Sequence, residues 1–145
     1  MRALLRSLVP VVSLCAGAAA VGVHGGCSSS VPPGPAAAGG KVTFQGRPLA
    51  GGLVVFAPDR DRGTTGKPAR GEVGPDGTFR LRLDGSDHIP PGWYRVAIAA
   101  APGEPPAGRP AFPPQLRRPD TSGLLRQVLP GQEHTFEFAV EVPNG

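Results

Sequence analysis

Cysteine is nearly absent from this sequence of 145 residues, which contains only two, Cys15 and Cys27. No cysteine follows Cys27, so no disulfide can staple a structure formed by the rest of the chain. The same absence excludes a zinc site with cysteine ligands in that region. A folded domain after Cys27 must therefore be held together by side-chain packing.

Runs of basic residues are also missing. Arg2 and Arg6 precede Cys27, so 13 of the 15 basic residues and all 11 acidic residues follow it, a formal charge of +2. Apart from Arg117-Arg118, no two basic residues are adjacent. Nucleic-acid binding requires a concentrated basic surface. The sequence therefore predicts no nucleic-acid partner.

The residues from which active sites are built are few and poorly spaced. Only His88 and His134 follow Cys27, and neither lies in a zinc-ligand spacing. Ser86-Asp87-His88 has the residue types of a catalytic triad, but neighbouring positions in a loop do not form a proton relay. The aspartates do not follow a calcium-loop pattern. We therefore expect no catalytic residues, no metal and no cofactor.

The N-terminal residues have the arrangement of a secretory signal. Arg2 and Arg6 precede an uncharged, largely apolar stretch at 7–23. A transmembrane helix is the alternative interpretation. The stretch is at the lower length limit for a membrane span, however, and it contains Pro10 and Gly17. The pattern favours export.

Gly25-Gly26-Cys27 resembles the lipobox of bacterial lipoproteins, in which a cysteine after small residues is diacylated and becomes the first mature residue. The chain has His24 where an aliphatic residue is usual. Ordinary signal-peptidase cleavage within 16–20 is the alternative, and it would give a secreted or periplasmic protein with an unpaired cysteine. Lipidation accounts for that cysteine. We therefore expect a signal peptide at 1–26 and membrane attachment through lipid on Cys27.

After the cysteine, a linker and a domain are expected. Residues 27–39 are small, uncharged and rich in Ser, Pro, Gly and Ala, which predicts a flexible tether. From 40 to 142, short apolar runs alternate with turn residues, as in an all-β chain. The predicted strands lie at 40–45, 53–57, 69–74, 78–83, 93–99, 124–129 and 134–140. Seven short antiparallel strands without a helix predict a small β-sandwich.

The alternation also predicts which side chains face the core. These inward residues are Phe79, Leu81, Leu83, Tyr94, Val96, Ile98, Phe136, Phe138 and Val140. Arg80 and Arg82 lie on the opposite face of their strand, and so do Trp93 and Arg95 on theirs. One face of each of these strands is therefore expected to meet solvent.

Three stretches carry a resemblance to a known family. They are G-K-V-T-F with its following turn from 40, the hairpin G-P-D-G-T-F at 74–79, and P-G-W-Y-R-V at 91–96. This succession resembles the transthyretin-like, carboxypeptidase regulatory-like domain of many small bacterial lipoproteins. The resemblance covers nearly all of 40–142 and implies an Ig-like sandwich. Such motifs consist of turn residues, which specify fold rather than activity.

The segment 101–123 is too long for an idle connection in a compact domain. It is rich in proline and carries Phe112, Leu116, Arg117 and Arg118, which we expect to form an interaction surface together with Trp93. The sequence thus predicts a non-catalytic envelope lipoprotein that serves as a structural or protein-interaction module. A carbohydrate-binding module that uses Trp93 is the alternative, so the expected partner is an envelope protein or a glycan.

Overall fold

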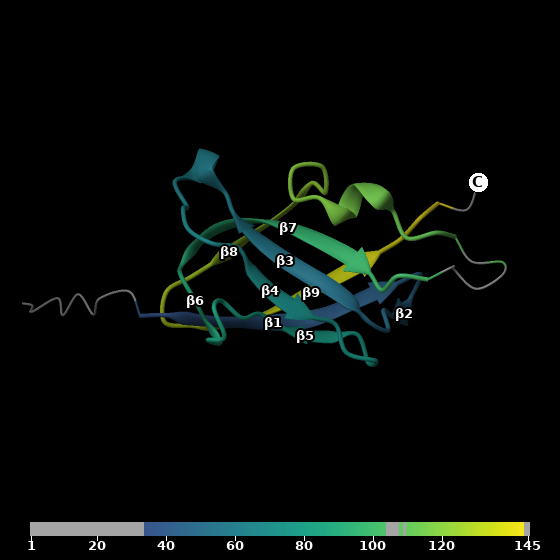
Figure 1. Ribbon diagram of the computed structural model, residues 1–145, viewed down its shortest axis with the longest axis horizontal. Helices are drawn as coiled ribbons and strands as arrows, with labels where there is room; N and C mark the ends of the chain where they lie inside the picture. The colour runs from purple at the N-terminus through teal and green to yellow at the C-terminus, as the bar shows by residue number, and fades with distance from the viewer. Residues whose placement is uncertain (1–33, 104–107, 109, 144–145) are drawn as a thin grey trace, which may run out of the picture. The chain divides into compact units, whose positions relative to one another are not determined.

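The computed structural model describes residues 34–103, 108 and 110–143, which form two β-sheets packed face to face (Figure 1). The strands are β1 (Ala36–Phe44), β2 (Arg47–Pro48), β3 (Gly52–Pro58), β4 (Ala69–Glu72), β5 (Thr78–Arg80), β6 (His88–Ile89), β7 (Gly92–Ala100), β8 (Leu124–Val128) and β9 (Glu133–Val140). Two short 3-10 helices join them, η1 (Arg60–Arg62) and η2 (Pro114–Arg117). None of the described helices has the length and hydropathy needed to cross a membrane. The predicted signal peptide and Cys27 lie outside the described residues.

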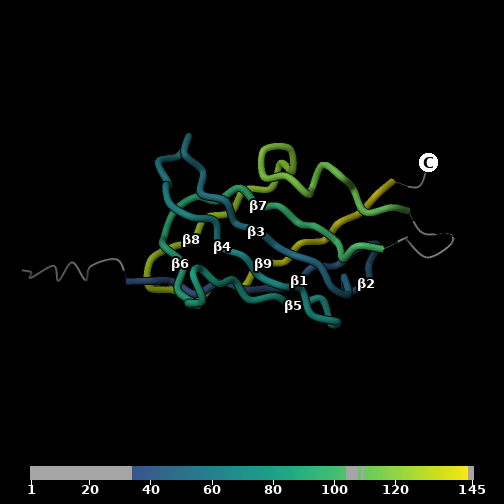
Figure 2. The backbone as a smooth tube through the Cα atoms, viewed as in Figure 1, coloured from purple at the N-terminus to yellow at the C-terminus, as the bar shows by residue number. Residues whose placement is uncertain are grey.

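One sheet has four antiparallel strands in the order β4-β3-β7-β8. The other sheet is built around β1, which pairs in parallel with β9 along one edge. The opposite edge of β1 pairs in turn with β6, β5 and β2, all antiparallel. This sheet is therefore mixed rather than wholly antiparallel as predicted. The first and last strands can run parallel because the chain between them crosses to the other sheet and back, as the tube in Figure 2 shows.

The predicted β-sandwich is confirmed, and each of the seven predicted strands coincides with an observed one. The two strands missing from the prediction, β2 and β6, have two residues each, too few to show alternation. The first strand begins at Ala36, inside the segment 27–39 that was predicted to be a tether. Ala36 and Ala38 are 1% and 2% exposed. Their small side chains carry no strand signal in the sequence, but they fit where β6 and β9 lie close on either side of β1.

The core lies between the two sheets and includes the side chains that the alternation assigned to it, together with others from β1, β3, β6 and β8. The fully buried ones with the largest volume are Tyr94, Phe56, Leu81, Ile89, Ile98, Val42, Val54, Val96 and Val128. Phe56 lies at the centre of an aromatic group, with its ring centroid 5.4 Å from that of Phe136 and 5.9 Å from that of Tyr94. Leu83 and Phe136 are only partly buried but pack against the same core. The predicted inward faces are confirmed.

The two long sides of the sandwich differ. On one side the sheets are joined, because Arg70 and Arg82 exchange backbone N–H to carbonyl hydrogen bonds of 2.9 and 2.7 Å between β4 and the chain after β5. On the other side β8 and β9 are edge strands of different sheets. Arg126 of β8 lies opposite the inward-facing Tyr94, and its guanidinium lies 4.8 Å above the ring of Phe138. An inward-pointing charge on an edge strand discourages pairing with another chain.

Tyr94 gives this fold a testable pH dependence. It is the only tyrosine, its side chain is buried, and its hydroxyl donates to the Pro90 carbonyl oxygen at 2.6 Å. Burial raises the pKa of the phenol. Because the folded-state pKa lies above the unfolded value of about 10, this group's contribution to stability is complete below that pH. It is lost as pH rises through the folded-state pKa.

We therefore expect phenolate absorbance to appear at higher pH in the native protein than in the denatured protein. The denatured titration should centre near the ordinary value of about 10. Tyr94→Phe should remove this part of the alkaline destabilisation. A native protein that ionises Tyr94 at the ordinary value while remaining folded would contradict the burial of this hydroxyl.

Candidate functional site

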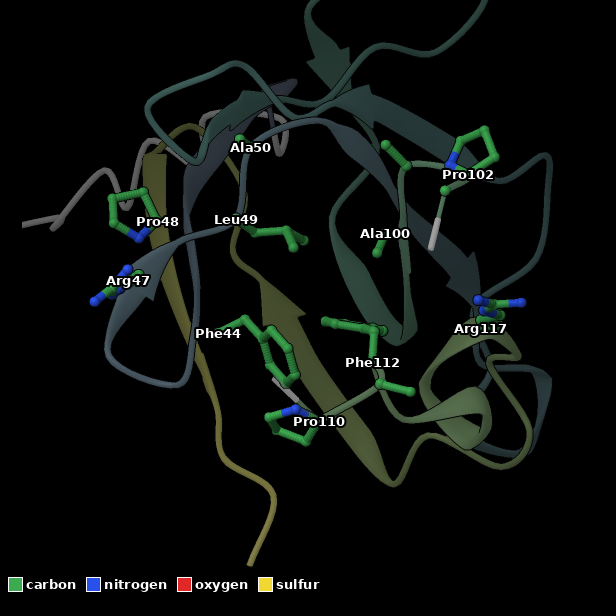
Figure 3. A pocket seen from close by; sticks show the side chains of 13 residues that line it. Phe44, Arg47, Pro48, Leu49, Ala50, Ala100, Pro102, Pro110, Phe112 and Arg117 are labelled. Atoms are coloured by element: carbon green, nitrogen blue, oxygen red, sulfur yellow. The ribbon is translucent and has the colours of Figure 1, made fainter. Parts of the chain in front are cut away.

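A cavity of about 390 Å³ opens at the end of the sandwich where β1 and β7 finish. It lies between the two sheets. Residues 100–103 border it on one side and residues 110–112 on another (Figure 3). The side chains of Phe44, Leu49, Ala100 and Phe112 point toward its centre. Most of the residues that line it have apolar side chains, and its volume falls in the range of small ligand sites.

Local chain geometry builds the cavity floor. Phe44 is the last residue of β1, and Gln45 and Gly46 turn the chain with positive φ angles of 51° and 72°. After this turn the Leu49 N–H donates to the Val42 carbonyl oxygen at 3.0 Å, so Leu49 lies over the end of the core. Its side chain is 8% exposed. The floor is therefore held by the backbone of a tight hairpin.

Phe112 attaches the long segment to this floor. Its ring centroid lies 5.2 Å from that of Phe44, and the two rings are tilted by 60°, a favourable aromatic contact. Phe112 is 9% exposed and belongs to the core cluster. The predicted interaction residue therefore contributes a wall of the cavity rather than an exposed surface.

Two arginines give the cavity margin a positive charge. Arg47 and Arg117 lie on opposite sides of the opening in Figure 3, and both are exposed. Among the described residues, neither has a carboxylate within the 4.0 Å of an ion pair. Arg118, by contrast, pairs with Asp120 at 3.0 Å. The opening thus combines an apolar interior with charge at its edges.

The five residues predicted to form one interaction surface are not brought together. Phe112 and Arg117 line the cavity. Leu116 packs against the core beside the β8 and β9 edges, and Arg118 is neutralised by a neighbouring aspartate. Trp93 lies near the start of β7, whereas the cavity is at the end of that strand. Sequence spacing could not reveal this separation, because it depends on where the chain after β7 packs in the fold.

Trp93 holds the loop around η1 in place through its ring and its backbone. The guanidinium carbon of Arg62 lies 4.7 Å from its ring centroid, a cation–π contact. Its backbone N–H donates to the Thr64 hydroxyl at 2.7 Å, and its carbonyl oxygen accepts from the Asp59 N–H at 2.8 Å. These bonds attach the loop around η1 to β7. Arg62 covers one face of the indole ring, and a sugar that stacks on Trp93 would need a ring face.

Asp59 is the centre of the same network. It is 3% exposed, its Oδ1 accepts from the Asp61 N–H at the start of η1, and its two oxygens lie 3.2 Å from Arg95 and 3.5 Å from Arg62. Arg95 also contacts the exposed Asp61. A buried carboxylate with three partners organises the loop rather than leaving a free binding group.

We expect Asp59→Ala to lower the free energy of unfolding by about 1–3 kcal/mol, because it removes a helix cap and leaves Arg95 without its buried partner. Urea denaturation followed by the fluorescence of Trp93, the only tryptophan, would measure the loss. Asp61→Ala is the matched control. That side chain is 81% exposed, so its loss should cost about 0–1 kcal/mol. Equal losses in the two variants would contradict this network.

The serine, aspartate and histidine residues considered as catalytic or metal-binding candidates make structural contacts. The Ser86 hydroxyl accepts from the His88 N–H at 3.1 Å, and Asp87 pairs with Arg82 at 3.0 Å and with Arg80 at 3.5 Å. His134 contacts the backbone of Leu129 through Nε2. Within the part of the chain that the structure describes, no three histidine, cysteine or carboxylate residues gather as a metal site would require.

Comparison of the chain with protein-family models, with curated proteins and with solved structures found no match. The site must therefore be interpreted from its own geometry. Phe44, Arg47 and Leu49 are site residues that the sequence pattern does not identify. The turn at 45–52, which is rich in glycine and proline, could have indicated them. It reverses the chain after Phe44 and so brings Leu49 close to the end of that strand.

Proposed function

We propose that this protein is a non-catalytic interaction module of the bacterial cell envelope, anchored through lipid on Cys27 and related in topology to transthyretin-like domains. The signal-like N-terminus and the lipobox-like sequence support anchoring. The clustered polar side chains, such as Asp59 with Arg62 and Arg95, form contacts that hold loops in place. This supports a binding role rather than a catalytic one.

The proposed binding site is the cavity at the end of the sandwich. The observation that carries this proposal is the combination of an apolar interior with two arginines at opposite margins, Arg47 and Arg117. An extended partner segment fits this arrangement when an apolar side chain enters the cavity and acidic residues on either side meet the arginines. Its partner is therefore an acidic, exposed polypeptide segment with a central hydrophobic residue.

A short peptide with leucine between two aspartates tests this site. In two-dimensional NMR it should shift the backbone amide signals of Phe44, Leu49 and Phe112, and the shifts should weaken as salt is added. The same peptide with asparagines in place of the aspartates is the ligand control. Arg47→Gln together with Arg117→Gln should weaken binding to the acidic peptide.

Arg60→Gln is the protein control, because Arg60 is an exposed arginine in η1 that does not line the cavity. It should bind the acidic peptide as the unchanged protein does. Signals that shift equally with both peptides, or that shift away from the cavity, would refute this assignment. The glycan alternative has weaker support, because Arg62 lies over one face of the Trp93 ring.

A further inference from the structure

The chain enters the sandwich at the end opposite the cavity. The Gly131 N–H donates to the Gly34 carbonyl oxygen at 3.0 Å, and the Ala37 N–H donates to the Gln132 carbonyl oxygen at 3.1 Å. The chain is therefore fixed from Gly34 onward against the turn between β8 and β9. Phe44, at the cavity, is at the other end of β1.

The distance from Cys27 to this entry point is limited by chain length. Cys27 lies seven residues before Gly34 in the sequence. Seven residues span at most about 25 Å when fully extended. From Gly34 to Phe44 the chain advances ten residues, and extended chain at about 3.3 Å per residue covers about 33 Å. A tether of this length cannot hold the sandwich inverted, with its cavity end on the membrane and Gly34 farthest from it.

The end near Gly34 carries an exposed apolar side chain. Among the described residues Leu129 is the one large hydrophobic residue that is exposed, at 39%. Its backbone is held in place, because its N–H donates to His134 Nε2 at 2.9 Å and its carbonyl oxygen lies 3.2 Å from the same nitrogen. The turn that carries Leu129 is the one that binds Gly34. The apolar side chain and the entry of the tether therefore share one end of the sandwich.

We infer that in the anchored protein the β8–β9 turn rests on the lipid surface with Leu129 in contact with the bilayer, while the cavity opens away from the membrane. This inference rests on the proposed anchoring through Cys27. It gives the two ends of the sandwich different partners: a lipid surface at the Leu129 end and a soluble or surface-exposed polypeptide at the cavity end.

Tryptophan quenching by brominated lipids tests this orientation. The full chain is expressed in bacteria, purified from membranes and reconstituted into vesicles that contain brominated phosphatidylcholine. In a Trp93→Phe background, one variant carries Leu129→Trp and the matched variant carries Ala111→Trp, an exposed position at the cavity. Leu129→Trp should lose a large part of its fluorescence in brominated vesicles, whereas Ala111→Trp should keep the intensity that it has in vesicles without bromine.

Intact mass of the same samples separates two kinds of failure. An acylated protein in which position 111 is quenched, or in which position 129 is not, would overturn the orientation but leave the anchoring intact. A protein without acyl chains on Cys27 would overturn both. Circular dichroism shows that each variant is folded, and Gln132→Trp in the same turn provides a second position, which should be quenched like position 129 if the turn meets lipid.

Discussion

Phe56→Ala is expected to lower the free energy of unfolding by about 3–5 kcal/mol, a large share of the about 5–15 kcal/mol that stabilises a typical domain. Phe56 is fully buried in β3, and its ring lies 5.4 Å from Phe136, 5.9 Å from Tyr94 and 6.4 Å from Phe138. Alanine leaves a cavity between both sheets that neither can close alone. The domain has no disulfide to restrict the unfolded chain, so its stability depends on packing.

Urea denaturation followed by circular dichroism measures this loss. Leu129→Ala is the matched control for removing a large apolar side chain, because Leu129 is exposed. Its effect on the purified protein in solution should stay within about 0.5 kcal/mol. If Phe56→Ala cost no more than Leu129→Ala, the packing of the two sheets around this ring would be wrong.

Gly40→Ala is expected to cost about 3 kcal/mol or more, because it forces apart the parallel pair of β1 and β9. Gly40 lies opposite Phe136 in that pair, and a Cβ at this position would come within 1.8 Å of the Phe136 carbonyl oxygen. Backbone cannot move aside as the tip of a side chain does. The variant should unfold at lower urea concentration or fail to accumulate as folded protein.

Gly46→Ala provides the comparison. Gly46 has a φ of 72°, so alanine is strained there, but nothing lies within 4 Å of the added Cβ. This variant should lose about 1–2 kcal/mol from backbone strain. Thermal unfolding of the two variants separates steric conflict from strain. Equal losses would show that β1 and β9 do not approach each other as closely as the structure has them.

The alternation of apolar and polar side chains was enough to predict the sandwich, because a sheet with one wet face repeats every two residues. Phe79, Leu81, Tyr94 and Val96 face the core as that period requires. Turn residues also marked the strand ends, as in the hairpin at 75–77. These features are local, so a single sequence carries them.

Features that depend on distant contacts could not be predicted. The parallel pairing of β1 with β9 joins residues about a hundred positions apart, such as Gly40 and Phe136. The alanines at the start of β1 have no pattern of their own and become strand because β6 and β9 supply partners. The cavity arises from the meeting of three separate segments around Phe44, Ala100 and Phe112. Only the fold brings these segments together.

The interaction surface was predicted as one patch because exposed aromatic and basic residues in a long loop commonly bind partners. The structure instead uses Phe112 as a core residue and Trp93 as the anchor for the η1 loop. Aromatic residues are among the best contributors to a small core. The chain has only one tryptophan, one tyrosine and six phenylalanines. With so few aromatic residues, most of them are needed for packing.

Intact-mass spectrometry of the mature protein, extracted from the membrane fraction of bacterial cells that express the full chain, tests the proposed anchoring most directly. We expect a chain that begins at Cys27 and carries the added mass of acyl chains. A chain cleaved within 16–20, or an unprocessed chain that retains Met1, would contradict it. Either result would remove the lipid anchor from which the two-ended arrangement follows.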